Sequence, residues 1–113
     1  MTTYEELNEI MLDNPCLFEG LNEDRQEKFK DWLPGNMNVY QAFVGYARQL
    51  KKSAKRDYYS ARAIWERLRW ESMTADTGIE YKINDLYMPF ISWLSMAAEP
   101  DLAGMFQTRK KAA

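Results

Sequence analysis

The sequence predicts a mainly α-helical fold of five to six helices in one compact domain. Three observations point to this class. The length of 113 residues fits one ordinary domain. Apolar residues recur at helical spacing in most segments, and residues that favour helix N-caps precede several of these segments. A small β-hairpin near residues 72–83 is the predicted exception, and with the preceding helices it would give a winged-helix-like arrangement.

Two short helices are predicted in the first third of the chain. Residues 4–12 follow Thr3, which has capping-box spacing to a glutamate three residues later, and they place apolar side chains on one face. Residues 23–33 follow Asn22 as the N-cap and carry acids in their first turn. A Pro-Gly dipeptide is expected to end this second helix.

Two longer helices are predicted in the middle of the chain. Residues 39–54 have the most regular apolar face, and Asn38 precedes them with capping-box spacing to Gln41. Residues 61–71 follow Ser60 as the N-cap and again place apolar side chains on one face. Both faces have the spacing of a buried helix surface.

A turn and a strand pattern follow these helices. Residues 76–78 are turn formers, and apolar side chains alternate with charged ones over 79–83. Residues 72–75 are the predicted partner strand. Trp70 lies off the inner face of the preceding helix, and we expect it to begin the hairpin and pack inward. The alternative is that Trp70 is a surface anchor for a partner.

The last helix is expected to begin between Asn84 and Pro89, because proline fits the first turn of a helix better than its interior. Its side chains are apolar nearly all round, which is typical of a central, buried helix. A Glu-Pro dipeptide at 99–100 ends it. The predicted organisation is an acidic N-terminal helical extension over 1–35, a helical core domain over 36–109 and a frayed tail over 110–113.

The net charge of −2 conceals a strong asymmetry along the chain. Residues 1–33 carry nine acids and three bases, residues 48–69 carry eight bases and two acids, and residues 70–113 carry four bases and six acids. The net charges of these segments are −6, +6 and −2. The protein is therefore predicted to be strongly dipolar.

The acidic first third is one candidate partner-binding site. Acidic side chains attract a basic protein surface, and they can imitate the phosphates of a nucleic acid on an enzyme that binds one. The simpler interpretation is that these acids form the solvent-exposed faces of two amphipathic helices. The candidate residues are Glu5, Glu6, Glu9, Glu23, Asp24 and Glu27.

The basic middle segment is a second candidate, for a protein partner or for nucleic acid. Bases beside two tyrosines are typical of phosphate and nucleobase contacts, and helix 61–71 would present arginines to a groove. The simpler interpretation is ion pairing at i, i+4, as in Arg62–Glu66 and Arg67–Glu71. The candidate residues are Arg48, Lys51, Lys52, Lys55, Arg56, Arg62, Arg67 and Arg69.

Catalytic groups are sparse in this sequence. It contains no histidine, the side chain best suited to proton transfer near neutral pH. Cys16 is the single cysteine, and it has no histidine to activate it. No phosphate loop, dinucleotide-binding glycine pattern or zinc-ligand spacing is present. We therefore predict a protein that is not an enzyme and that carries no cofactor and no metal.

Several features bear on location. The acidic start of the chain lacks the apolar stretch of an export signal. The longest apolar stretch, residues 86–98, has 13 residues and is too short to span a bilayer. The single cysteine favours a reducing compartment. We expect a cytoplasmic protein without a membrane partner.

A distinctive motif spans Tyr59–Glu71, where the chain reads YSARAIWERLRWE. The chain then reads YKIND at 81–85, has Pro89, and reads PDLAGMFQTR at 100–109. In these motifs it resembles a family of small bacteriophage and prophage proteins of unestablished function. The resemblance implies a location in the host cell cytoplasm, and it transfers no catalytic residue.

A phage setting indicates a function in binding, because small accessory phage proteins without catalytic groups commonly act in this way. We predict an accessory protein that binds a host protein or protein complex stoichiometrically and inhibits a defence or nucleic-acid-processing complex. The alternative is a winged-helix-like protein that binds nucleic acid or regulates it. A homodimer is compatible with both predictions.

Overall fold

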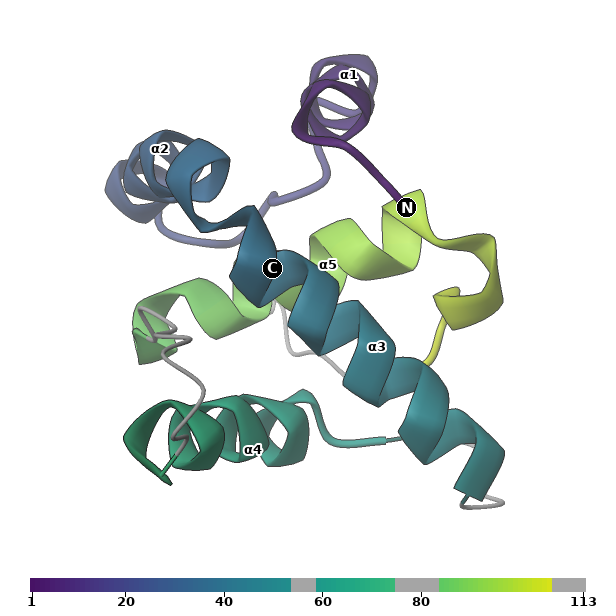
Figure 1. Cartoon of the computed structure of the whole chain (residues 1–113). Coiled ribbons are helices and arrows are strands. Elements are labelled where there is room, and N and C mark those ends of the chain that lie inside the picture. The colour runs from purple at the N-terminus through teal and green to yellow at the C-terminus, as the bar shows by residue number, and fades with distance from the viewer. Residues whose placement is uncertain (54–58, 75–83, 107–113) are drawn as a thin grey trace.

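The computed structural model describes residues 1–53, 59–74 and 84–106, and these residues form a mainly helical, compact fold (Figure 1). The predicted fold class is confirmed at this level. The α-helices are α1 (Tyr4–Asp13), α2 (Glu23–Trp32), α3 (Met37–Ser53), α4 (Ala61–Thr74) and α5 (Met88–Ala98). Short 3₁₀ helices are η1 (Leu33–Asn36), η2 (Asp85–Tyr87) and η3 (Pro100–Leu102).

Helices α3 and α5 form the centre of the molecule. Helix α4 packs against both of them, and α1 packs against α5. In Figure 1, α1 and α2 lie on one side of α3 and α5, and α4 lies on the other side. An isolated parallel bridge between Tyr59 and Phe106 joins the start of α4 to the residues after η3, and the Tyr59 N–H donates to the Met105 carbonyl at 3.0 Å.

The core is rich in aromatic side chains, which come from α2, α3, α4, α5 and the loops beside them. Phe43 on α3 contacts Trp65 on α4 and Phe106 beyond η3, with ring centroids 6.2 and 5.5 Å apart. On the other side of the core, Phe29 on α2 stacks on Phe90 of α5 at 5.2 Å. Aromatic pairs of this kind add to the free energy of area burial.

The predicted acidic extension over 1–35 shares this core. Leu7 of α1, Phe29 of α2 and Leu33 of η1 are all fully buried, and they belong to the same hydrophobic cluster as the core residues of α3, α4 and α5. The extension is therefore distinguished by its charge, and it packs as part of the same globular unit. The predicted tail over 110–113 lies outside the described residues.

The local signals for helix starts agree with the structure in three cases. Thr3 and Glu6 form the predicted capping box, with the Thr3 hydroxyl accepting from the Glu6 N–H at 3.2 Å. The Asn22 side chain accepts from the Arg25 N–H at 3.1 Å. The Ser60 hydroxyl accepts from an N–H in the first turn of α4 at 3.4 Å.

The predicted cap at Asn38 is wrong, because α3 already begins at Met37. The backbone keeps helical φ and ψ angles after α2. Pro34 occupies the first turn of η1, and η1 leads directly into α3. Proline is compatible with this position because the first N–H groups of a helix have no intrahelical acceptor. Asn38 therefore lies inside a helix and cannot cap it.

The predicted strand at 72–75 is also wrong for residues 72–74, because α4 continues through them to Thr74. The other residues of the predicted hairpin, 75–83, lie outside the described part of the chain. Trp70 was expected to pack inward, and instead it is 65 % exposed on α4. The helix extends past the residues where the alternating pattern was expected to begin, so Trp70 stays on its outer face.

Candidate functional site

Helix α1 presents acidic side chains to solvent. Leu7 and Met11 are buried and fix the inner face of the helix. Glu5 and Glu9, which are four residues apart, are exposed on another face. Glu6 is exposed as well, and its carboxylate accepts from the Thr3 N–H at 3.4 Å and from the Thr3 hydroxyl at 3.2 Å. Glu6 therefore stabilises the start of α1 in addition to contributing charge.

Helix α2 continues the acidic surface. Glu23 and Asp24 lie in its first turn, where negative charge stabilises the helix dipole, and Glu27 lies one turn further along. All three side chains are exposed. We call the exposed acids of the two helices the acidic surface; they are Glu5, Glu6, Glu9, Glu23, Asp24 and Glu27.

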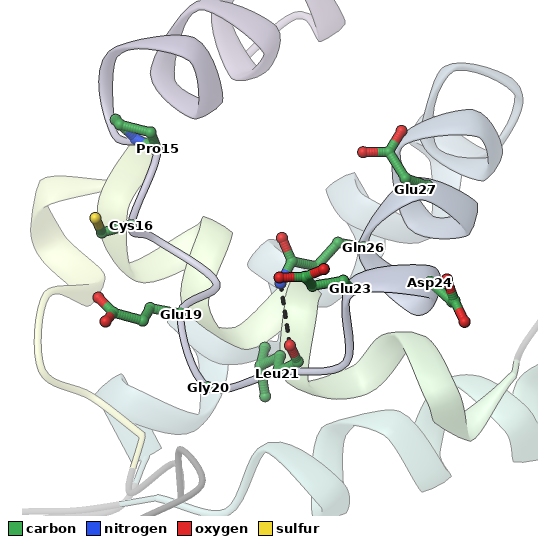
Figure 2. Close-up of a pocket in the computed structure, with 9 residues that line it drawn as sticks. All are labelled: Pro15, Cys16, Glu19, Gly20, Leu21, Glu23, Asp24, Gln26 and Glu27. Atoms are coloured by element: carbon green, nitrogen blue, oxygen red, sulfur yellow. Dashed lines mark hydrogen bonds between the residues drawn. The ribbon is translucent and has the colours of Figure 1, made fainter. Parts of the chain in front are cut away.

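A cleft of about 480 Å³ opens beside α2, between this helix and the loop that joins it to α1 (Figure 2). The Gln26 side-chain amide holds the loop in place by donating to the carbonyls of Phe18 and Leu21 at 3.2 and 3.1 Å. The cleft is lined by Pro15, Cys16, Glu19, Gly20, Leu21, Glu23, Asp24, Gln26 and Glu27. Its charged lining residues are all carboxylates, so it extends the negative potential of the acidic surface.

Most of this negative charge has no ion-pair partner in the part of the chain that the structure describes. Among the described residues, only one of the nine acids in residues 1–33 forms an ion pair, between Glu27 and Lys30 at 3.9 Å. Both side chains of that pair are exposed, so its contribution to stability is small. Ion pairs within the described residues therefore leave most of the net charge of −6 over residues 1–33 in place.

The predicted basic residues on α3 are placed differently, because α3 brings them against carboxylates near the end of α5. The Arg48 guanidinium donates to Asp101 at 2.9 Å and to Glu99 at 3.0 Å. The Lys51 ammonium donates to the Asp101 carbonyl. Hydrogen bonding to Asp101 raises the pKa of Arg48, and Arg48 in turn holds the pKa of the Asp101 carboxyl below its usual range.

The arginines of α4 are also paired. The predicted i, i+4 pair Arg62–Glu66 is confirmed, at 3.6 Å. Arg69 contacts Glu66 at 2.8 Å and also pairs with Asp85 of η2. The hydrogen bond to Asp85 is the main cause that raises the pKa of the Arg69 guanidinium.

Arg67 completes this set of charges on α4. Its predicted pair with Glu71 is confirmed at 3.3 Å, and its guanidinium lies 5.2 Å from the centre of the Tyr46 ring. The Tyr46 hydroxyl donates to the same Glu71 carboxylate. Of the remaining predicted bases, Lys52 is exposed at the end of α3, and Lys55 and Arg56 lie outside the described residues.

The acidic surface and the predicted bases of α4 are thus on different parts of the molecule. The acidic surface lies on α1 and α2, and the arginines of α4 lie across α3 and α5 from it (Figure 1). The sequence reasoning missed Glu99 and Asp101 as partners of Arg48, because they are about half the chain away and carry no local signal other than the helix-ending Glu-Pro dipeptide.

Two further observations concern the described part of the chain. It contains no group of three or more His, Cys, Asp and Glu side chains arranged to hold a metal ion. None of its helices combines the length and the apolar character that are needed to cross a membrane.

No protein-family model matches this chain, and no curated protein or solved structure is detectably similar to it. The resemblance to phage proteins, and the function that it implies, therefore stay predictions. The geometry and charge of the surface are the basis for a functional proposal.

Proposed function

We propose that this protein acts by stoichiometric binding and that its acidic surface attaches to a basic surface of a host protein or protein complex. A defence or nucleic-acid-processing complex is the target class that fits best, because such complexes hold nucleic acid on surfaces rich in lysine and arginine. Bound there, the carboxylates of α1 and α2 would occupy the positions of phosphates and inhibit the complex. The site of action would be the cytoplasm of the host cell.

The observation that supports this proposal is the contrast between the two charge clusters. The acids of α1 and α2 are exposed, and all but one of those in residues 1–33 have no ion pair with another described residue. The arginines on α3 and α4, by contrast, already have carboxylate partners. Unpaired charge on a rigid surface steers association and selects a partner of opposite charge.

Nucleic-acid binding through α4 stays the alternative. In that case Arg62, Arg67 and Arg69 would have to exchange their carboxylate partners for phosphates, and the carboxylates would remain nearby and repel the same phosphates. A homodimer that pairs the acidic surface of one copy with the cations of another is a further arrangement, which sedimentation equilibrium of the purified protein would detect.

The first experiment is an affinity capture from host lysate, performed with and without nuclease. The expected result is a discrete protein that is recovered in both conditions. Recovery of nucleic acid, with the associated proteins lost after nuclease, would contradict the proposal and favour the α4 alternative. Recovery of the chain alone would count against the proposal.

The second experiment tests the surface itself. A variant with Glu23→Gln, Asp24→Asn and Glu27→Gln is expected to bind the captured partner at least about tenfold more weakly, because it removes three charges without changing side-chain shape. Isothermal titration or surface plasmon resonance would measure the affinity at several salt concentrations, and the slope against salt should become shallower.

The same helix supplies the matched control. Arg25→Gln with Lys28→Gln removes exposed positive charges from α2 and should leave the affinity unchanged or increase it. Equal losses in the acidic variant and in this control would contradict the proposed surface. Glu6 is left intact in all variants because it also caps α1.

A further inference from the structure

We propose that Glu99 is a positioning residue for the acidic surface, because its buried carboxylate fastens the residues before α1 to the junction of α5 and η3. This inference rests on the proposed function, since it gives the orientation of α1 a role in partner binding. The contact between Thr2 and Glu99 is called the latch below.

The Glu99 carboxylate has three side-chain donors. Glu99 is only 6 % exposed at the end of α5. Its Oε2 atom accepts from the Thr2 hydroxyl at 2.7 Å and from the Tyr40 hydroxyl at 2.7 Å, and its Oε1 atom accepts from the Arg48 guanidinium at 3.0 Å. A buried carboxylate with this many donors is held in one orientation.

The residue before the capping box is held on two sides. The Thr2 hydroxyl donates to Glu99, and the Thr2 carbonyl accepts from the Gln41 side-chain amide of α3. Thr3, the next residue, is the N-cap of α1. Thr2 and the N-cap are adjacent residues, so the position of Glu99 determines where the first turn of α1 begins.

Charged and titratable groups surround the latch. Arg48 bridges Glu99 and Asp101, and Lys51 donates to the Asp101 carbonyl behind it. Burial, reinforced by the hydrogen bond to Glu99, raises the pKa of the Tyr40 hydroxyl well above its ordinary value, so that it remains a neutral donor.

The rest of α1 has a separate attachment. Leu7 and Met11 are buried in the hydrophobic core and hold the middle and the end of the helix. Loss of the latch is therefore expected to free the first turn, which carries Glu5 and Glu6, while the second half of α1 remains docked. The functional consequence is a change in the spacing between the acids of α1 and those of α2.

The experiment is residue-resolved amide hydrogen exchange by NMR on the free, full-length protein. Thr2→Val and Glu99→Gln are each expected to accelerate exchange of the Glu6 and Leu7 amides, which donate to Thr3, by about tenfold, a change of about 1.4 kcal/mol in the free energy of opening. The amides of α3 and α5 should keep their protection. Thr2→Ser, which retains the hydroxyl, should restore slow exchange.

Asp101→Asn is the matched control, because it removes a carboxylate from Arg48 without touching Thr2 or Tyr40. Exchange in α1 should be unchanged in this variant. Unchanged exchange of α1 in Thr2→Val, or an equal acceleration over all helices, would overturn the latch. Thr2 is only partly buried, so the Thr2→Val protein is expected to fold even where Glu99→Gln does not.

Partner binding then tests the positioning role separately. Glu99→Gln should weaken binding in the parent protein and have a smaller effect in a background of Glu5→Gln with Glu9→Gln, because one of the two acids of the first turn is then already neutral. Additive losses would overturn the role of Glu99 in binding. Failure to capture any partner would count against the proposed function, while the exchange result would still decide the latch.

Discussion

Replacing Phe29 with alanine is expected to lower the free energy of unfolding by about 3–5 kcal/mol. Phe29 is fully buried and its ring is surrounded by other rings. It stacks on Phe90 at 5.2 Å and contacts Phe18, Trp32 and Tyr87 at 5.7, 5.9 and 6.0 Å. Alanine would remove the ring that joins α2 to α5 and leave a cavity that the aromatic neighbours cannot fill without moving.

Equilibrium unfolding in urea, followed by tryptophan fluorescence, measures this loss. Leu12→Ala is the matched control, because Leu12 is 71 % exposed on α1 and its truncation should change stability by no more than about 0.5 kcal/mol. A cost below about 1 kcal/mol for Phe29→Ala would contradict the packing of the acidic segment into the common core. In that case the helices of residues 1–35 would not belong to the cooperative unit.

Replacing Tyr40 with phenylalanine is expected to cost about 1–3 kcal/mol near neutral pH. The Tyr40 hydroxyl is buried and donates to Glu99 at 2.7 Å, so phenylalanine leaves the buried carboxylate with one donor fewer. Thermal or urea unfolding of the two proteins at the same pH gives the difference directly. The ring itself is kept, so the loss reports the hydroxyl and not the packing.

The same pair of proteins should differ in their response to alkaline pH. The pKa of Tyr40 is raised above its ordinary value of 10.0, mainly by burial and then by the hydrogen bond to Glu99. The folded protein therefore keeps a proton that the unfolded chain releases. This stabilisation is complete below about pH 10 and is lost above it, by about 1.4 kcal/mol per pH unit, as the pH rises toward the folded pKa.

The measurement is the free energy of unfolding of both proteins as a function of pH, together with a spectrophotometric tyrosine titration. Above pH 10, the free energy of unfolding of the parent protein should fall more steeply with pH than that of Tyr40→Phe. The difference in slope should correspond to one proton released on unfolding. Parallel curves would show that the Tyr40 hydroxyl ionises in the folded protein as it does in the unfolded chain.

The helices with strong local signals were predictable from the sequence. Thr3, Asn22 and Ser60 stand at the starts of α1, α2 and α4, and a helix start depends on the few residues nearest to it. The wrong assignments have different causes. Asn38 has a side chain that favours caps, yet it lies inside α3 beside the buried Val39 and Tyr40. The strand predicted over 72–75 depended on pairing with 79–83, and α4 continues through 72–74 instead.

The candidate site was also predictable only in part. Exposure of Glu5 and Glu9 follows from the helical position of Leu7, so the acidic surface was predictable. The pairing of Arg48 with Asp101 and Glu99 was not predictable, because it depends on how α3 crosses the end of α5. Without these partners, the bases of α3 looked in the sequence like a free binding patch.

The contact between Thr2 and Glu99 joins residues that are 97 positions apart, and it has a consequence for synthesis of the protein. A ribosome adds roughly 5–20 residues per second, so α1 and α2 emerge several seconds before α5, against which α1 packs. During that interval Leu7 and Phe29 lack the part of the core that α5 supplies. The acidic helices are therefore expected to fold late, when α5 has emerged, and the nascent chain should not compete with finished molecules for the partner.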